Sequence, residues 1–291
     1  MIEPRRLLRK AERRQHAAAV LYLVPAGLLF ALLYVYPLVL LLLTSLFDPA
    51  FTLRHYEYLV ARPVYLRILL LTFRVAATVT LVSLLLGYPI AFLLTTAPAR
   101  RTRLVMALVL LPFWISVLVR NYAWVALLSR TGVVNRVLLA TGLVAEPIVL
   151  MFNPIGVMIG LTYILIPFMI FALYSVMSGI DRELLRAAAS LGATPWQGFL
   201  RVFLPLSLPG VAAGSLLVFI MGIGSFITPA LLGGGRVPMI ATLIESQVRE
   251  VLNWGLGSAI AVVLLLTTLG LYAVYSRVLG AEHLLGSDHR V

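Results

Sequence analysis

Long uncharged apolar stretches dominate this sequence of 291 residues and limit how it can fold. Five of them cover residues 17–47, 75–99, 147–180, 202–235 and 251–276, and a sixth, 104–129, is interrupted only by Arg120. Each is longer than the roughly 20 residues that a helix needs to cross the hydrocarbon of a bilayer. None alternates between apolar and polar residues as the strands of a membrane barrel do. The sequence therefore predicts an all-α membrane protein with six transmembrane helices.

The composition supports solvation by lipid. Hydrophobic residues make up 62% of the chain and charged residues 12%, which leaves too little polar surface to cover a soluble globule. The apolar run after the N-terminus is too long for a signal peptide and has no clear cleavage site, so we expect it to be an uncleaved first span. We place the six spans at residues 17–46, 68–97, 104–128, 153–178, 207–232 and 254–278.

The distribution of basic residues indicates the orientation. The net charge of +12 arises from 22 arginines and Lys10, set against 11 acids. These cations cluster beside the spans, which favours an effect of membrane topology over nucleic-acid binding. Six of them lie between Arg5 and Arg14, directly before the first span, so the positive-inside rule places the N-terminus in the cytoplasm. The same rule places loops 98–103 and 179–206 and the tail after residue 278 inside the cell.

The chain has no internal repeat and no low-complexity linker, so we expect one domain. Residues 1–16 then form a basic cytoplasmic segment, residues 17–279 a single transmembrane domain, and residues 280–291 a cytoplasmic tail.

The loop between the fourth and fifth spans contains signals for two short helices. Asp181 is a good N-cap, and the helix that follows it is expected to end at Gly192. Thr194 then caps a second helix, with Pro195 at the first helical position and Gln197 completing a capping box. We expect this second helix to end at Phe203, before Pro205.

Small residues give this loop a surface that another protein could approach closely. They are Ala187, Ala188, Ala189 and Gly192. On physical grounds alone, the loop is either a docking site or a helical hairpin that merely connects two spans.

The spacing of this loop resembles a known pattern. Ala187-Ala188, three residues, Gly192, nine residues, Val202, one residue and Leu204-Pro205 resemble the EAA loop of the type I permeases of binding-protein-dependent ABC importers. In that family, the loop, here residues 181–209, forms a coupling helix that docks into a groove of a cytoplasmic ATPase. Arg186 departs from the pattern, because the family usually has glutamate there, although Glu183 lies one turn earlier. The residues that the resemblance assigns to ATPase docking are Glu183, Arg186, Ala187, Ala188, Gly192, Ala193, Thr194, Pro195, Trp196, Leu204 and Pro205.

Three further stretches, 86–92, 111–124 and 226–234, look like the first permease subunit of spermidine/putrescine-class transporters. The resemblance covers about residues 20 to 279. It implies a multi-pass protein of the bacterial inner membrane that imports a polyamine or related small organic compound by alternating access. It also implies a second permease subunit, two copies of a subunit that binds ATP and Mg, and a periplasmic substrate-binding protein. A different protein is the favoured second permease, and a second copy of this chain is the alternative.

The sequence offers no means of catalysis. A nucleotide-binding Walker A loop needs a Gly-Lys-Ser/Thr sequence, and the only lysine, Lys10, lies outside any such motif. There is no cysteine, and the four histidines, His16, His55, His283 and His289, all lie outside the spans. We therefore expect no metal site and no cofactor in this chain, with ATP hydrolysis left to a partner.

Candidates for a solute pathway are the polar and aromatic residues in or near the spans. They are Arg74, Trp114, Arg120, Tyr122, Ser225, Phe226, Thr228 and Glu245. Charged groups within a membrane are costly and are functional hypotheses by default. Simpler explanations stay open: the arginines could snorkel to the interface, the aromatics could anchor it, and Glu245 could be an ordinary periplasmic acid.

The fifth span is unusually rich in glycine and polar residues between Gly222 and Gly235. Such a segment could loosen as part of a gate or pathway, or its small residues could simply allow close helix packing.

The spans hold almost no carboxylates, so either the partner permease supplies acids to a cationic solute or the solute is not strongly cationic. An ion-coupled carrier that works alone is the main alternative, but it predicts buried carboxylates and often inverted repeats, neither of which is found in the sequence. A scaffold or membrane enzyme would leave the loop pattern unexplained.

Overall fold

The structure is a computed structural model that describes residues 23–47 and 50–278. The expected basic segment 1–16, the start of the first span and the tail 280–291 lie outside these described residues. Within the described ranges, six helical segments are long and apolar enough to cross a membrane: Leu23–Leu46, Pro63–Thr96, Val117–Ala140, Pro154–Met177, Pro195–Ile223 and Trp254–Arg277. The prediction of an all-α protein with six membrane helices is confirmed.

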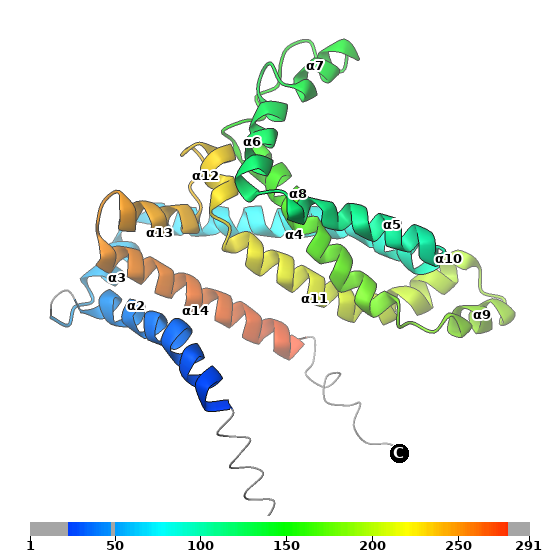
Figure 1. The fold of residues 1–291 in the computed structure, drawn as a ribbon, viewed down its shortest axis with the longest axis horizontal. Helices are drawn as coiled ribbons and strands as arrows, with labels where there is room; N and C mark the ends of the chain where they lie inside the picture. Colours follow the sequence, from blue (N-terminus) through cyan, green and yellow to red (C-terminus); the bar gives the residue numbers. More distant parts are fainter. Residues whose placement is uncertain (1–22, 48–49, 279–291) are drawn as a thin grey trace, which may run out of the picture.

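The helices follow one another along the chain, with the longer segment 141–153 between α7 and α8 (Figure 1). After a first helical stretch, their bounds are η1 Ala31–Val35, α2 Tyr36–Leu46, α3 Arg54–Ala61, α4 Pro63–Thr96, α5 Ala99–Leu110, η2 Leu111–Trp114, α6 Val117–Leu128, α7 Val133–Ala140, α8 Pro154–Met177, α9 Arg182–Ser190, α10 Pro195–Gly198, η3 Phe199–Phe203, α11 Leu204–Ile223, α12 Ile227–Gly233, α13 Ile240–Arg249 and α14 Trp254–Val278.

Three long helices, α4, α8 and α11, pack against one another and form the core. Val79, Met169 and Val218 are fully buried there. Gly214 allows α11 to approach α8 closely, because a Cβ atom at this position would lie 2.7 Å from the Met169 sulfur. This trio is the rigid frame that carries the loop between α8 and α11.

A second group of helices lies beside this core (Figure 1). The helices α2 and α14 pack side by side, and α13 packs on α14. Ile68 of α4 joins Ile240, Leu256 and Ile260 in a smaller apolar cluster. Most side chains of α2 are exposed, which suits a helix surrounded by lipid or by another membrane protein.

The third predicted span is not one helix. Residues 104–128 were expected to be continuous, but α5 ends at Leu110, a short 3₁₀ turn follows, and α6 begins only at Val117. Pro112 explains the interruption, because proline has no N–H to donate to the preceding turn and its ring clashes with the carbonyl four residues earlier. The membrane-length segment Val117–Ala140 instead consists of α6 and α7 with a turn between them.

The fifth predicted span, residues 207–232, also differs. The second helix of the loop does not end at Phe203, because α10, η3 and α11 form one continuous helix from Pro195 to Ile223. At η3, the Leu204 N–H donates a hydrogen bond to the Phe199 carbonyl. This wider π-type turn accommodates Pro205, which follows. The helix then stops before α12, within the glycine-rich segment that the sequence singles out.

Candidate functional site

The loop between α8 and α11 projects from one end of the helix bundle (Figure 1). Its first helix, α9, begins at the predicted cap: the Asp181 carboxylate accepts a hydrogen bond from the Glu183 N–H at 2.9 Å. Glu183 lies in the first turn, where the helix dipole favours a negative charge. The start of the predicted loop helix is therefore confirmed.

Gly192 ends α9 in the way that its sequence position predicts. Its φ angle is +85°, in the left-handed region that disfavours residues with a side chain. The Ala193 N–H donates to the Ala188 carbonyl and the Gly192 N–H to the Ala189 carbonyl, each at 3.0 Å. These two bonds form a Schellman motif, which satisfies carbonyls that the helix end would otherwise leave free.

The second helix starts at Thr194 with the predicted capping box. Its hydroxyl accepts from the Gln197 N–H at 3.3 Å, and the Gln197 side chain accepts from the Thr194 N–H at 2.9 Å. Pro195 takes the first helical position, and Trp196, which follows it, is 66% exposed. Since this helix continues into α11, the turn at Gly192 is connected rigidly to a membrane helix.

The side chains of α9 divide into an inner and an outer face. Leu185 packs against the core, and Ala188 is half-buried. Ala187, Ala189 and Gly192 are exposed. The predicted small-residue surface is thus accessible except at Ala188. Leu204 and Pro205 lie farther along, in the first turn of α11.

A cluster of aromatic rings, which sequence reasoning missed, holds the loop against α4. Phe92 of α4 contacts Phe203 and Phe199, with ring centroids 4.9 and 5.6 Å apart. Phe199 in turn stacks on Trp196 at 5.7 Å. The spacing of four residues between Phe199 and Phe203 was an available signal, because residues four apart share one face of a helix.

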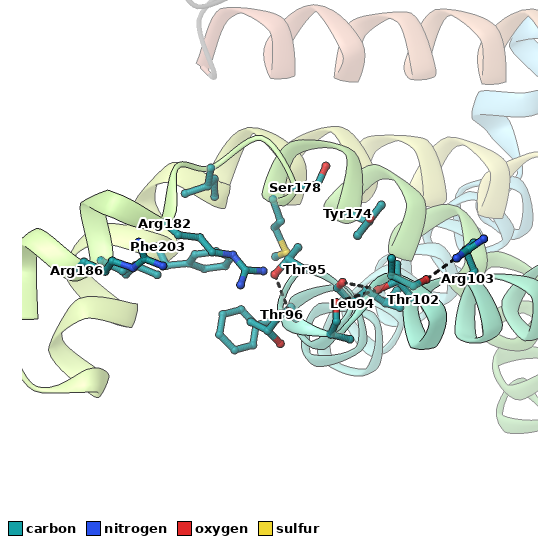
Figure 2. Close-up of a pocket in the computed structure, with 16 residues that line it drawn as sticks. Leu94, Thr95, Thr96, Thr102, Arg103, Tyr174, Ser178, Arg182, Arg186 and Phe203 are labelled. Atoms are coloured by element: carbon teal, nitrogen blue, oxygen red, sulfur yellow. Dashed lines mark hydrogen bonds between the residues drawn. The ribbon is translucent and has the colours of Figure 1, made fainter.

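A cavity of about 700 Å³ lies between the ends of α4 and α8 and the helix α9. Figure 2 shows Arg182 extending from the loop toward Thr95 and Thr96. Arg103 and Arg186 also line the cavity, and none of its lining residues within the described ranges is a carboxylate. The arrangement is therefore suited to an anionic group, and Arg186, the departure from the family pattern, is an exposed residue at the border of this cavity.

The residues suggested for a solute pathway occupy different environments. Arg74, Trp114 and Tyr122 are exposed on the surface of the chain. Half-buried Glu245 forms an ion pair with Arg249 at 3.4 Å. These four residues lie in different elements, α4, η2, α6 and α13, and none of them belongs to the loop. A role in transport stays a prediction for each.

Ser225, Phe226 and Thr228 gather where α11 gives way to α12. Thr228 is only 3% exposed, because α12 packs on α8 where Gly160 leaves room. A Cβ atom at Gly160 would lie 2.9 Å from the Thr228 methyl group.

Arg120 is the one charged pathway candidate that the chain buries, since it is 9% exposed. Its helix, α6, packs against α12, so it lies on the same side of the molecule as the interrupted helix. The structure thus brings the helices of Arg120 and Thr228 together.

Comparison with protein families identifies one match that covers most of the chain. The family model described as "Binding-protein-dependent transport system inner membrane component" matches residues 20–279.

Two curated relatives illustrate the range of similar proteins. The spermidine/putrescine transport system permease protein PotB of Escherichia coli is 39% identical over 227 residues, covering 78% of this chain and 82% of the relative. The molybdenum transport system permease protein ModB of Mycobacterium bovis is 32% identical over 225 residues, covering 76% and 81%.

A solved structure has the same fold. A chain from the crystal structure of a bacterial alginate ABC transporter in complex with an alginate pentasaccharide-bound periplasmic protein aligns with a TM-score of 0.78. The alignment covers 94% of this chain and 96% of that chain, at 18% sequence identity.

Proposed function

Because the chain belongs to the family of binding-protein-dependent transport system inner membrane components, we propose that it is one permease subunit of an ATP-driven importer for a polyamine or a related small organic compound. A second, different permease subunit completes the membrane pathway. Two copies of a cytoplasmic subunit bind and hydrolyse ATP with Mg, and a periplasmic binding protein delivers the solute.

The observation that carries this proposal is the geometry of the coupling loop, residues 181–209. Two capped helices meet at the left-handed Gly192, and the second is continuous with a membrane helix. A push on the exposed side of α9 therefore reaches α11 through the single hydrogen-bonded turn at Gly192. This is the mechanical link that an ATPase needs if it acts on a pathway in the membrane.

The same proposal sets the orientation. The loop docks an ATPase, so it lies in the cytoplasm, and the basic N-terminal residues lie on that side too. ATP binding brings the two ATPase copies together, the coupling loops move with them, and the permease pair opens alternately to each side of the membrane.

The solute class rests on the relatives. The relative at 39% identity is a spermidine/putrescine permease and the one at 32% a molybdenum permease, which favours a polyamine or a similar amine. An amine in the pathway would be attracted by carboxylates and aromatic faces. Since this chain has almost no carboxylate in its spans, the partner permease supplies that charge.

Reconstitution of the four-component importer in proteoliposomes tests this function. With the binding protein outside and ATP inside, we expect labelled spermidine to accumulate. Molybdate provides the matched solute control. Spermidine uptake that requires an ion gradient and proceeds without the ATPase would refute the proposal in favour of an ion-coupled carrier.

A further inference from the structure

Arg120 is buried in a way that leaves its charge unbalanced within the described chain. The residue is 9% exposed, and its buried Nε atom has no hydrogen-bond partner. In the part of the chain that the structure describes, no carboxylate forms an ion pair with it. The one ion pair among these described residues joins Arg249 and Glu245.

Asn121, the next residue, also has a buried polar atom without a hydrogen-bond partner. Asn121 is fully buried, and its side-chain N–H donates to the Val117 carbonyl at 2.8 Å within the same helix. Its side-chain oxygen, however, has no partner. Two adjacent polar side chains therefore each retain one unsatisfied buried atom, whereas such atoms are rare in folded proteins.

The position of α6 explains the burial. Trp124, one turn beyond Arg120, contacts Tyr163 of α8 with ring centroids 5.4 Å apart, and Leu128 reaches the core. Residues three or four apart share a helix face, so Arg120 and Asn121 lie toward α8 and α12. Arg120 thus lies on the covered face of α6, the helix that packs on α12, in the segment that the sequence suggests as a gate.

The opposite side of α6 is uncovered. Leu118, Val119 and Tyr122 are 52%, 60% and 60% exposed. Val119 of this strip directly precedes Arg120, so a helix of another subunit that packed on the strip would lie against the turn of α6 that carries the arginine.

We infer that Arg120 pairs with a carboxylate of the second permease subunit when the importer assembles. This inference rests on the proposed function, which requires that subunit. An unpaired charge in a membrane interior is strongly unfavourable, whether it is Arg120 of this chain or a carboxylate of the partner. An ion pair between the two neutralises both charges. A cationic solute would be repelled by Arg120 alone, which favours the partner, rather than the solute, as the source of the carboxylate.

Co-purification with the partner permease tests the pairing. The complete importer is extracted in mild detergent through a tag on this chain, and retention of the second permease is quantified. Truncating one side of a buried, hydrogen-bonded charge pair is costly, so we expect Arg120→Gln to lower partner affinity about tenfold or more. Arg120→Lys should retain more partner, and Arg136→Gln, which changes an exposed arginine of α7, should match the unaltered chain.

A second measurement protects the test from misfolding of the Arg120 variants. Each Asp and Glu in the spans of the partner is changed to Asn or Gln and combined with the unaltered chain and with Arg120→Gln. One of these changes should lower retention by itself and add little to Arg120→Gln, as expected for two sides of one contact. The inference is overturned if Arg120→Gln retains the partner normally, or if no partner acid couples to it. Failure of the unaltered importer to transport would instead refute the proposed function.

Discussion

Replacing Gly192 by alanine isolates the contribution of the backbone turn to coupling. A Cβ atom at this position would meet no heavy atom within 4 Å, so alanine adds no clash within the chain. The φ angle of +85° nevertheless costs a residue with a side chain roughly 1–2 kcal/mol. This cost corresponds to an about 5- to 30-fold larger population of the opened turn.

Amide hydrogen exchange measures this opening directly. The Ala193 N–H, which donates to the Ala188 carbonyl, should exchange faster by the same factor in Gly192→Ala. Asparagine tolerates the left-handed region better, so Gly192→Asn should exchange more slowly than Gly192→Ala. An unchanged exchange rate in Gly192→Ala, or faster exchange in the asparagine variant, would refute the reasoning.

Uptake by the same variants distinguishes the effect of the backbone turn from the effect of side-chain size at the docking surface. If only the turn matters, Gly192→Asn should transport better than Gly192→Ala. If the ATPase groove also requires a small residue, both variants should transport poorly while folding normally. Gly192→Arg should insert in the membrane but lose assembly or ATP-driven uptake, and normal uptake would show that the loop is a mere connector.

Three further changes test the local packing. Thr194→Ala removes the cap of α10 and should destabilise its first turn by about 1 kcal/mol, seen as faster amide exchange there, whereas Thr194→Ser should retain the cap. Gly160→Leu should lower the melting temperature in detergent, because overpacking costs about 1–3 kcal/mol, while Gly27→Leu, in open space, should not. The 2.8 Å hydrogen bond between the Tyr88 and Ser207 hydroxyls should give a coupling of about 0.5–1.5 kcal/mol in a double-mutant cycle of Tyr88→Phe and Ser207→Ala.

Each of these expectations would be contradicted if the variant and its control gave the same result. Equal exchange in the alanine and serine variants at the cap, equal melting of the two leucine variants, or additive effects at the hydroxyl pair would show that the contact in question contributes nothing measurable.

The parts of the loop that sequence reasoning predicted are those determined by neighbouring residues. Asp181, Gly192 and Thr194 act on backbone groups within a few positions of themselves, so their roles can be derived from spacing alone. The interruption near Pro112 also had a local signal, but the length of the apolar run suggested a continuous helix instead.

Long-range contacts could not be derived in this way. Phe92 and Phe203 are far apart in the sequence, and their contact depends on how α4 packs beside α11, the helix that continues η3. The burial of Arg120 likewise depends on the docking of α6 against α12. Hydrophobic periodicity identifies a helix face but does not say which other helix will cover it.

Site-specific cross-linking from the coupling loop tests the central claim most directly. The chain has no cysteine, so a single Ala187→Cys on the exposed side of α9 provides a unique attachment point. In the assembled importer, we predict that a short cross-linker joins this cysteine to the ATP-binding subunit. A cysteine at Val60, which is 86% exposed in α3 at the opposite end of the bundle, should not be joined to it. A cross-link from Val60→Cys, or none from Ala187→Cys in an importer that is assembled and active, would contradict the account.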